Sequence, residues 1–198
     1  MSETSTSQDP VSYYIDHTIY TGRPADTTSR LPKEIRTYDL LDSLGIAYAR
    51  ADHDTLPTME ACQEVGNLLG IEICKNRFLR NTQKTAFYLL ILPGRKKFKT
   101  AALSKQIGSA RLSFAEPEFM EQYLNITPGS VSVLGLMNDP ENKVRLLIDK
   151  DILKNHPYFG CHPCINTSSL KFRTEDLLNK ILPAIHHDYT MVDLPYAE

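Results

Sequence analysis

The middle of the chain carries the pattern that most limits its fold, two strands joined by a tight turn. Residues 71–80, IEICKNRFLR, alternate with a period of two from Cys74 to Leu79, which is typical of a strand. Residues 85–94, TAFYLLILPG, form a run with high β propensity. The polar residues 81–84, NTQK, lie between the two runs and suit a hairpin turn. The sequence therefore predicts a β-hairpin over these residues.

Helices and short strands are predicted on both sides of this hairpin. Capping residues and glycines mark the helix ends, as Thr58 and Gly70 do for one of them. The expected helices are residues 31–45, 58–70, 101–108, 117–124 and 174–185, the last capped by Thr174. A helical turn is expected at 151–155, and strands at 48–54, 111–114, 127–137 paired with 143–149, 158–163, 169–173 and 190–194. Because the elements lack a regular β-α-β order, the expected class is α/β or α+β with a mixed sheet.

The length of 198 residues suits one domain with an extension. Residues 1–30 are rich in Ser, Thr, Asp and Pro, and we expect them to form a tail or a loosely docked arm. Residues 31–198 are expected to form the domain. No apolar run reaches the roughly 18 residues that a membrane helix needs, and no N-terminal segment combines a basic region with an apolar core. We therefore expect a cytoplasmic protein that binds no membrane.

The formal net charge of −2 excludes a protein that coats DNA or RNA by bulk electrostatics. It permits a local basic patch that contacts a few phosphates. The loop at residues 94–99, GRKKFK, contains Lys96, Lys97 and Lys99 around Phe98. Such a loop is solvated by default, but it could also bind RNA phosphates without sequence specificity.

The chain has four cysteines, Cys62, Cys74, Cys161 and Cys164. Without a secretory signal they are expected to be reduced thiols. Residues 160–164, GCHPC, contain a C-x-x-C pair, but a tetrahedral zinc site usually needs a second close ligand pair, which the sequence lacks. A redox motif should begin a helix, whereas Pro163 and the following NTSS indicate strand and turn. We therefore expect no metal and no cofactor.

Four segments, in this order along the chain, resemble one known family. They are CKNRFLRN at 74–81, AALSKQIGSARLSFA at 101–115, TPGSVSVLGLMNDP at 127–140 and HPCINTSSL at 162–170. By these segments the chain is identified as a member of the YbaK/prolyl-tRNA-synthetase-associated family of aminoacyl-tRNA deacylases. It most resembles the free-standing members that clear alanine from proline tRNA. The resemblance runs from about Leu31 to Leu194. It implies a single domain with a mixed, partly curled sheet flanked by helices, and an ester-hydrolysing site without metal.

The resemblance also assigns residues to a site. The family lysine falls on Lys75, and the family's histidine and asparagine fall on His162 and Asn166. Other residues expected to bind substrate are Asn76, next to the lysine, and the loop Gly129, Ser130, Val131 and Ser132. The family loop normally ends in proline, whereas this chain has Val133, so the stiffness of the loop is in question. Candidate walls for the amino-acid side chain are Ile46, Pro57 and Thr58, and candidate RNA contacts are Arg80, Lys96, Lys97 and Lys99.

These residue types suit the chemistry of an aminoacyl ester. The ester is already a reactive acyl donor, so a site needs positioning and charge stabilisation more than a strong nucleophile. Lys75 could hold the terminal phosphate or the substrate carbonyl as a point charge. Backbone N–H groups around Gly129 could form an oxyanion hole, because glycine allows close approach to a ligand. The resemblance suggests that the free hydroxyl of the terminal ribose activates the attacking water.

Each of these residues also has an ordinary structural explanation. A single strand lysine such as Lys75 is usually solvated, and Gly129 could be a simple turn glycine. His162 could be a packed or capping residue that shapes the pocket without moving protons. Asn166 could hydrogen-bond its own backbone in a turn.

The expected function is the hydrolysis of mischarged proline tRNA, with alanyl-tRNA(Pro) as the substrate and its 3′ acceptor end as the part that is bound. Such a site must admit alanine and sterically exclude the proline ring. Two alternatives stay open: a deacylase for cysteine on proline tRNA or for another small amino acid, and a non-catalytic tRNA-binding or regulatory module. Prolyl-tRNA synthetase is a candidate partner, and the oligomeric state is left open.

Overall fold

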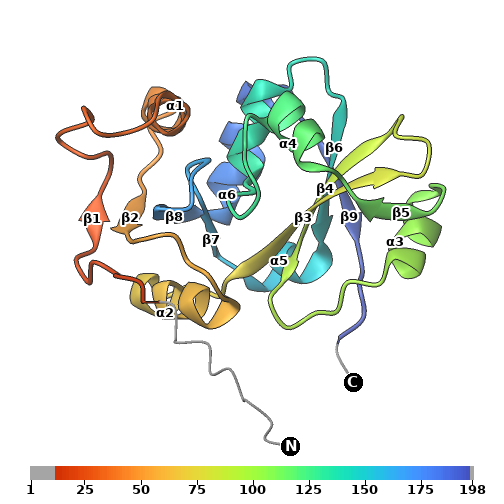
Figure 1. Ribbon diagram of the computed structural model, residues 1–198, viewed down its shortest axis with the longest axis horizontal. Helices are drawn as coiled ribbons and strands as arrows, with labels where there is room; N and C mark the ends of the chain where they lie inside the picture. The colour runs from red at the N-terminus through yellow and green to blue at the C-terminus, as the bar shows by residue number, and fades with distance from the viewer. Residues whose placement is uncertain (1–11, 197–198) are drawn as a thin grey trace, which may run out of the picture.

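The predicted hairpin is confirmed in the computed structural model, which describes residues 12–196 (Figure 1). Strands β3 (Cys74–Asn81) and β4 (Phe87–Pro93) pair antiparallel, with Cys74 opposite Pro93 at the open end of the hairpin. The hairpin forms the centre of a five-stranded sheet with the order β5-β3-β4-β6-β9. This is the mixed sheet that the sequence predicted.

The other strands of this sheet flank the hairpin on its two sides. β5 (Leu112–Phe114) pairs antiparallel with the end of β3. β6 (Val144–Asp149) runs parallel to β4, and β9 (Tyr189–Val192) runs parallel to β6. Helices α3 (Thr100–Ile107), α4 (Pro117–Leu124) and α5 (Lys150–Asn155) lie in the connections between them.

A second sheet contains the remaining strands, which the sequence did not separate from the first. It is antiparallel with the order β1-β2-β8-β7. Its strands are β1 (Tyr20–Thr21), β2 (Ala49–Asp52), β8 (Ser168–Arg173) and β7 (Tyr158–Cys161). In Figure 1 this sheet lies on the left, and β3 runs from its border into the larger sheet on the right.

The first helices follow the predicted boundaries closely. α1 (Pro32–Ser43) is followed by Gly45 at a positive φ of 65°. α2 (Met59–Leu69) begins at Thr58, whose Oγ1 accepts a hydrogen bond from the Ala61 amide, and it ends at Gly70 in the left-handed conformation. These are the expected N-cap and glycine stop.

Two predictions about secondary structure are wrong. Residues 127–137 are not a strand, because η1 (Val133–Asn138) is a 3₁₀ helix that Ser132 caps through the Leu134 amide. The expected partner, β6, already pairs with β4 and β9 along both edges, so no edge is open to these residues.

The second error concerns the cap of the last helical segment, whereas the segment itself lies where it was predicted. α6 (Thr174–Asp176) continues through a π-helical stretch, η2 (Leu177–Ile181), into α7 (Leu182–Ala184). Thr174 is not its cap. The Thr174 hydroxyl donates instead to the His156 carbonyl oxygen, which lies 18 residues earlier in the chain.

The described part of the N-terminal segment, residues 12–30, packs on the second sheet. Ile15 is buried and forms a β-bridge with His53, and Tyr20–Thr21 adds the outer strand β1. The rest of the expected tail, residues 1–11, lies outside the described residues.

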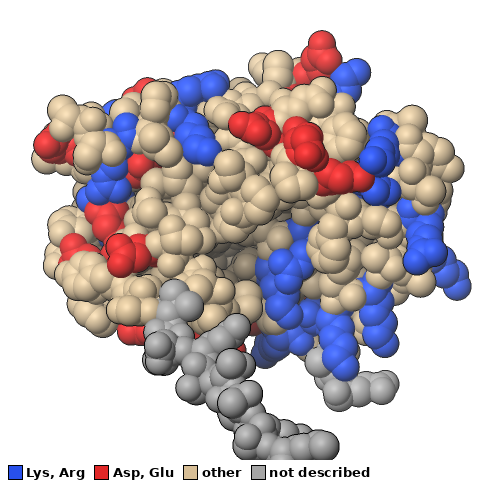
Figure 2. Space-filling view, viewed as in Figure 1, with Lys and Arg blue, Asp and Glu red and all other residues tan. Residues whose placement is uncertain are grey.

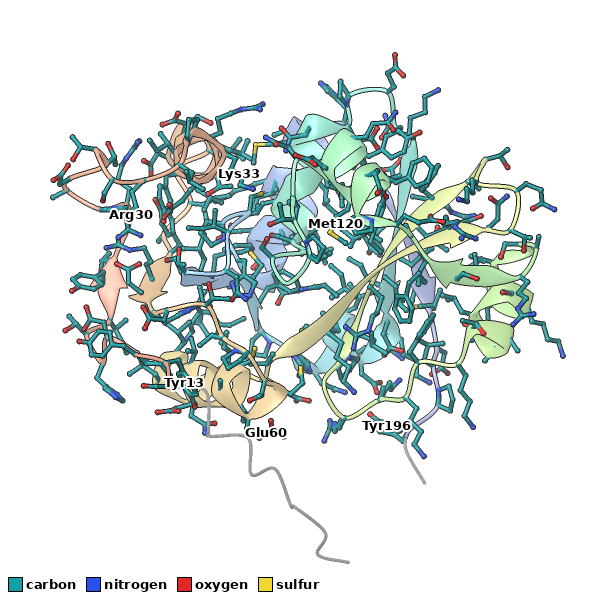
Figure 3. The ribbon with its side chains drawn as sticks, in the orientation of Figure 1. Tyr13, Arg30, Lys33, Glu60, Met120 and Tyr196 are labelled. Atoms are coloured by element: carbon teal, nitrogen blue, oxygen red, sulfur yellow. The ribbon has the colours of Figure 1, made fainter. Side chains whose placement is uncertain are left out.

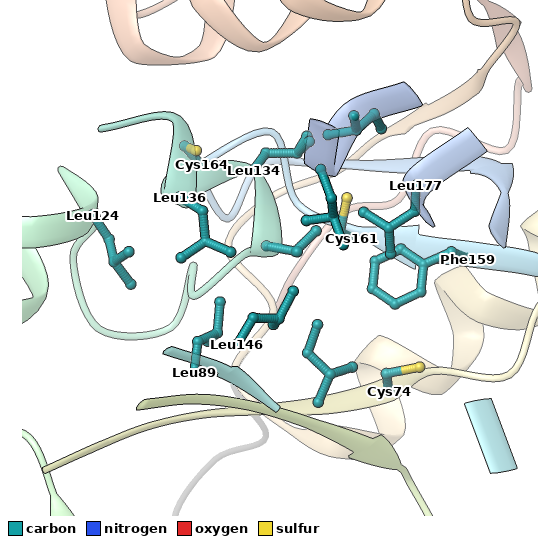
Figure 4. Packing of buried hydrophobic residues seen from close by; sticks show 14 of the residues in the cluster. Cys74, Leu89, Leu124, Leu134, Leu136, Leu146, Phe159, Cys161, Cys164 and Leu177 are labelled. Atoms are coloured by element: carbon teal, nitrogen blue, oxygen red, sulfur yellow. The ribbon is translucent and has the colours of Figure 1, made fainter. Parts of the chain in front are cut away.

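The hydrophobic core explains why β4 is a continuous apolar run. Leu89 and Ile91 face the main cluster between the two sheets, part of which Figure 4 shows. Leu90 and Leu92 face a second cluster on the opposite side of the larger sheet. Both faces of β4 are therefore buried. No helix within residues 12–196 has the length and apolarity to cross a membrane.

Candidate functional site

The candidate site is a pocket of about 540 Å³ beside the first half of β3. β5 pairs with β3 only over Leu79–Asn81, so the outer edge of residues 74–78 is free of a neighbouring strand for most of its length. The pocket lies along this edge and is closed by segments from both sheets. Figure 2 shows a hollow near the middle of the surface that faces the viewer. Figure 3 labels Met120 of α4, which is one of the residues that line the pocket.

Most of the substrate-binding residues predicted from the sequence meet in this pocket. The lining includes Pro57, Thr58, Lys75, Asn76, Gly129, Val131, His162 and Asn166. These residues come from the start of α2, from β3, from the loop before η1 and from the loop between β7 and β8. The fold thus joins four segments that are separated by tens of residues in the chain.

Lys75 is partly buried and has one intramolecular partner among the described residues. Its Nζ donates a hydrogen bond of 3.1 Å to the carbonyl oxygen of Lys96. It forms no salt bridge with the carboxylates of residues 12–196. An ammonium group with spare donors can bind an oxygen of a ligand in the pocket.

Asn76 connects β3 to the loop that carries Gly129. Its Nδ2 donates to the Val131 carbonyl oxygen at 3.1 Å. Its Oδ1 is buried and has no hydrogen-bond partner in residues 12–196. The Oδ1 of Asn166 is likewise buried without a described partner. Unpaired buried acceptors are rare because they cost free energy, and both of these amide oxygens can accept a hydrogen bond from a ligand donor.

Gly129 has a φ of +92°, a backbone conformation that other residues rarely adopt. A Cβ atom built there would lie 3.5 Å from Asn166 Nδ2, which places these two residues side by side. The Gly129 N–H donates to no acceptor in residues 12–196. It can therefore donate to a ligand oxygen.

The replacement of the family proline by Val133 does not leave the loop end free. Val133 is the first residue of η1 and is fully buried in the main core. Ser132, also fully buried, caps η1. Burial and capping thus fix this end of the loop, where the family pattern has a proline ring.

His162 is neutral near pH 7. Its Nδ1 donates to the Ser168 carbonyl oxygen at 2.8 Å, which leaves Nε2 as an acceptor. Burial lowers the pKa of His162 to about 4, and the neighbouring His53 ring, 6.0 Å away, acts in the same direction. A histidine in this state can shape the pocket and accept a hydrogen bond, but it carries no charge.

A serine–histidine pair at the pocket was missed in the sequence. Ser169 lines the pocket, and its hydroxyl is 2.9 Å from Nε2 of the buried His53. The His53 Nδ1 donates to the Asp54 carbonyl oxygen at 2.8 Å, so Nε2 accepts a hydrogen bond from the Ser169 hydroxyl. The two residues are 116 positions apart, and no local pattern in the sequence connects them.

The pocket is electrostatically one-sided. Its charged lining residues are Lys75 and Arg77, and none of the described lining residues is Asp or Glu. Arg77 was not predicted, although the period of two in β3 places it on the same face as Lys75. Beside the pocket, the loop between β4 and α3 exposes Arg95, Lys97 and Lys99, and Figure 2 shows basic side chains gathered along this border of the hollow.

Some predicted site residues lie elsewhere. Ile46 is 5% exposed and packs in the main core, so it is not a pocket wall. Ser130 and Ser132 are buried outside the lining. Both serines bond to backbone groups of their own loop and its helix. The sequence could not show these orientations, because they depend on how the loop folds.

The predicted RNA contacts divide into two groups. Lys97 and Lys99 are exposed and stay candidates. Lys96 is 1% exposed and forms ion pairs with Asp149 and Asp151, so it cannot reach an RNA phosphate. Arg80 is 2.8 Å from Glu116, a carboxylate that also pairs with Lys84, so this group keeps a net positive charge and the Arg80 contact stays a prediction.

The C-x-x-C pair lies at the end of a strand and in the turn that follows it. Cys161 ends β7, and Cys164 lies in the following turn at a φ of 62°. This confirms that the motif does not begin a helix. Across residues 12–196, no three His, Cys, Asp or Glu side chains gather as a metal site would require.

Comparisons with known proteins agree with this geometry. The sequence profile of the aminoacyl-tRNA editing domain matches residues 53–180. The "Prolyl-tRNA editing protein ProX" of Acetoanaerobium sticklandii is 31% identical over 154 residues, covering 78% of this chain and 93% of the relative. The "Prolyl-tRNA synthetase associated domain-containing protein 1" of Bos taurus is 27% identical over 142 residues, covering 70% of this chain and 82% of the relative.

The fold is also found among solved structures. One of them, described as a candidate trans-editing enzyme for prolyl-tRNA synthetase, superposes with a TM-score of 0.60 at 16% identity. The match covers 84% of this chain and 99% of that structure.

Proposed function

Because the chain belongs to the aminoacyl-tRNA editing domain family, we propose that it is a hydrolase that cleaves the ester of mischarged proline tRNA in trans. Alanyl-tRNA(Pro) is the preferred substrate, in keeping with the similarity to a prolyl-tRNA editing protein. The 3′ acceptor end of the tRNA enters the pocket. The reaction takes place in the cytoplasm, where a prolyl-tRNA synthetase is the candidate source of the mischarged tRNA.

The observation that carries this proposal is the combination of donors in one pocket. Lys75 Nζ and the Gly129 N–H line the same cavity, and neither is occupied by a carboxylate of the described chain. Hydrolysis of an ester passes through a tetrahedral intermediate with a negative oxygen. Donors that are already oriented toward that oxygen lower the barrier without reorganisation.

The roles of the residues follow from their chemistry. Gly129 N–H and Lys75 Nζ stabilise the oxyanion. The two unpaired amide oxygens, Asn76 Oδ1 and Asn166 Oδ1, accept hydrogen bonds from the α-ammonium group of the aminoacyl moiety. The attacking water is activated by the free hydroxyl of the terminal ribose, as the family resemblance suggests; the described pocket lining contains no carboxylate.

Specificity for alanine is assigned to rigid walls of the pocket. A rigid wall can exclude the proline ring, whereas a pocket that still admits the larger ligand discriminates a methylene by only about 1–3 kcal/mol. Thr58 is held by its cap hydrogen bond with the Ala61 amide, Pro57 precedes it in the chain, and His162 is held by its bond to Ser168. These fixed residues are the candidates for the wall.

The proposal is tested by the rate of ester loss from alanyl-, prolyl- and cysteinyl-tRNA(Pro). The intact protein should clear the alanyl ester and spare the prolyl ester. Lys75→Ala should lose at least about 100-fold in kcat, the scale of one oxyanion donor, while Lys143→Ala, an exposed lysine outside the lining, should keep the activity. If the cysteinyl ester were lost faster than the alanyl ester, cysteinyl-tRNA(Pro) would be the preferred substrate instead. Binding of tRNA without any turnover would reduce the protein to a binding module.

The serine–histidine pair supplies a second mechanism that the same assay separates. If the Ser169 hydroxyl attacked the ester, an acyl-enzyme would form and Ser169→Ala would abolish turnover. Direct attack of water predicts that Ser169→Ala keeps turnover within about 10-fold and that hydroxylamine traps no acyl group on the protein.

A further inference from the structure

Arg77 is a cation in the pocket for which the described chain provides no counter-ion. It lies two residues after Lys75 in β3, lines the same cavity and is partly buried. Its side chain makes one hydrogen bond among residues 12–196, from Nη1 to the backbone oxygen of the adjacent Asn76 at 3.2 Å. No described carboxylate lies within salt-bridge distance of it.

Two neighbouring arginines, unlike Arg77, have a carboxylate partner. Arg80, on the same strand, pairs with Glu116 at 2.8 Å, and Arg95 lies 3.7 Å from Glu72. Burial lowers the pKa of Arg77, and no nearby acid acts against this effect. Burial of an uncompensated charge costs free energy. An anionic ligand bound beside Arg77 would offset this cost.

We propose that Arg77 binds the phosphodiester on the 5′ side of the terminal adenosine of the acceptor end. The inference rests on the proposed function, because it takes the RNA 3′ end as the ligand. The planar guanidinium fork matches two phosphate oxygens, and charge-assisted bonds of this kind are stronger than the backbone contact that the side chain makes now.

The spacing in β3 suits a phosphate on Arg77 and the ester on Lys75. Side chains two residues apart on a strand project from the same face about 7 Å apart, a separation comparable with the span of one nucleotide from its 5′ phosphate to its 3′ hydroxyl. With the phosphate on Arg77, Lys75 is left for the ester. The Lys75 ammonium also donates to the Lys96 carbonyl oxygen. The Arg77 guanidinium can replace its bond to the Asn76 backbone oxygen with bonds to a ligand.

The test uses two alanyl esters that differ by one cytidylyl group, which adds the phosphodiester. The first is the 2′(3′)-O-alanyl ester of adenosine, and the second is the same ester of the dinucleotide CpA. Both are measured for kcat/KM with the intact protein and with Arg77→Gln, Arg77→Lys and Arg145→Gln. Arg145 is an exposed arginine of β6 outside the lining and serves as the control.

Arg77→Gln should lower kcat/KM by about 10- to 100-fold for the CpA ester and by less than about 2-fold for the adenosine ester. Arg77→Lys should recover part of the loss, and Arg145→Gln should match the intact protein. Equal losses on both esters would overturn the proposal, since they would make Arg77 a support for β3. Equal rates of Arg77→Gln and the intact protein on the CpA ester would also overturn it.

A binding measurement separates this inference from the proposed function. The affinity of uncharged CpA relative to adenosine is measured by calorimetry, which needs no turnover. An intact protein that cleaves neither ester contradicts the proposed function. If CpA still binds more tightly than adenosine, and Arg77→Gln removes the difference, the phosphate contact stands; if the two bind equally, it fails as well.

Discussion

The Lys75 Nζ atom donates a hydrogen bond of 3.1 Å to the carbonyl oxygen of Lys96, a residue whose own side chain is buried. Lys96 Nζ lies 2.9 Å from Asp149 and 2.9 Å from Asp151, at the junction of β6 and α5. Tyr196, labelled in Figure 3, donates to the same Asp151 carboxylate. The backbone position that holds the lysine of the site is thus itself fixed by a buried charge cluster.

Removing the Lys96 ammonium should destabilise the protein strongly. In Lys96→Met the fully buried carboxylate of Asp149 loses its cation, and breaking a buried pair in this way costs about 3–5 kcal/mol. Urea unfolding measures the loss. The control is Lys97→Met, which changes an exposed lysine in the same loop and should shift stability by less than about 0.5 kcal/mol. Equal stabilities of the two variants would contradict the role of the cluster.

Gly129→Ala should reduce activity more than Gly108→Ala, although both substitutions place a side chain on a residue with a positive φ. Gly129 at φ +92° and Gly108 at φ +64° both resist a side chain, at about 1–2 kcal/mol each. A Cβ at Gly108 would meet nothing within 4 Å, and this residue ends α3 outside the pocket lining. Both alanine variants should unfold at lower urea concentrations. Ester hydrolysis should fall at least 10-fold in Gly129→Ala alone; similar activities would argue against an oxyanion role for its amide.

The neutral state of His162 predicts how stability depends on pH. Its pKa is about 4 when folded and about 6.5 when unfolded. Between these values the unfolded chain binds a proton that the folded chain does not, so the free energy of unfolding falls as pH is lowered through this window. The pKa of His53 is also lowered by burial, which adds to the same trend.

His162→Gln should therefore flatten the dependence of stability on pH between about pH 6.5 and pH 4, as measured by urea unfolding at several pH values. The deacylation rate should show no titration of His162 above about pH 5, because the imidazole stays neutral there. A kinetic inflection near pH 6.5 that disappears in His162→Gln would instead make this residue a proton donor or acceptor.

The cysteines of the C-x-x-C motif should be unreactive. Burial raises the pKa of the Cys74 and Cys164 thiols to about 12, and that of the Cys161 thiol as well. Only thiolates react with iodoacetamide, so the native protein should be alkylated first at Cys62, which is partly exposed at the pocket. Peptide mapping by mass spectrometry identifies the site. Rapid alkylation at Cys161 or Cys164 would show that the motif opens in solution.

Local patterns in the sequence determined the elements around the site. The period of two in β3 and the apolar run of β4 predicted the hairpin, and Thr58 and Gly70 marked the ends of α2. These features follow from backbone conformation and side-chain burial within one element, so neighbouring residues suffice to encode them. Residues matched through the family resemblance, such as Lys75 and Gly129, were placed in one pocket by the structure.

Only the tertiary structure decided which charges face the pocket. The sequence shows Lys96, Lys97 and Arg77 as similar cations, yet Lys96 is buried against Asp149, Lys97 is exposed, and Arg77 lines the cavity without a described acid beside it. The same holds for residues 127–137, whose strand-like pattern found no free edge beside β6. The physical reason is that the environment of a charge, or the partner of a strand, depends on segments far away in the chain, and local propensity carries no information about them.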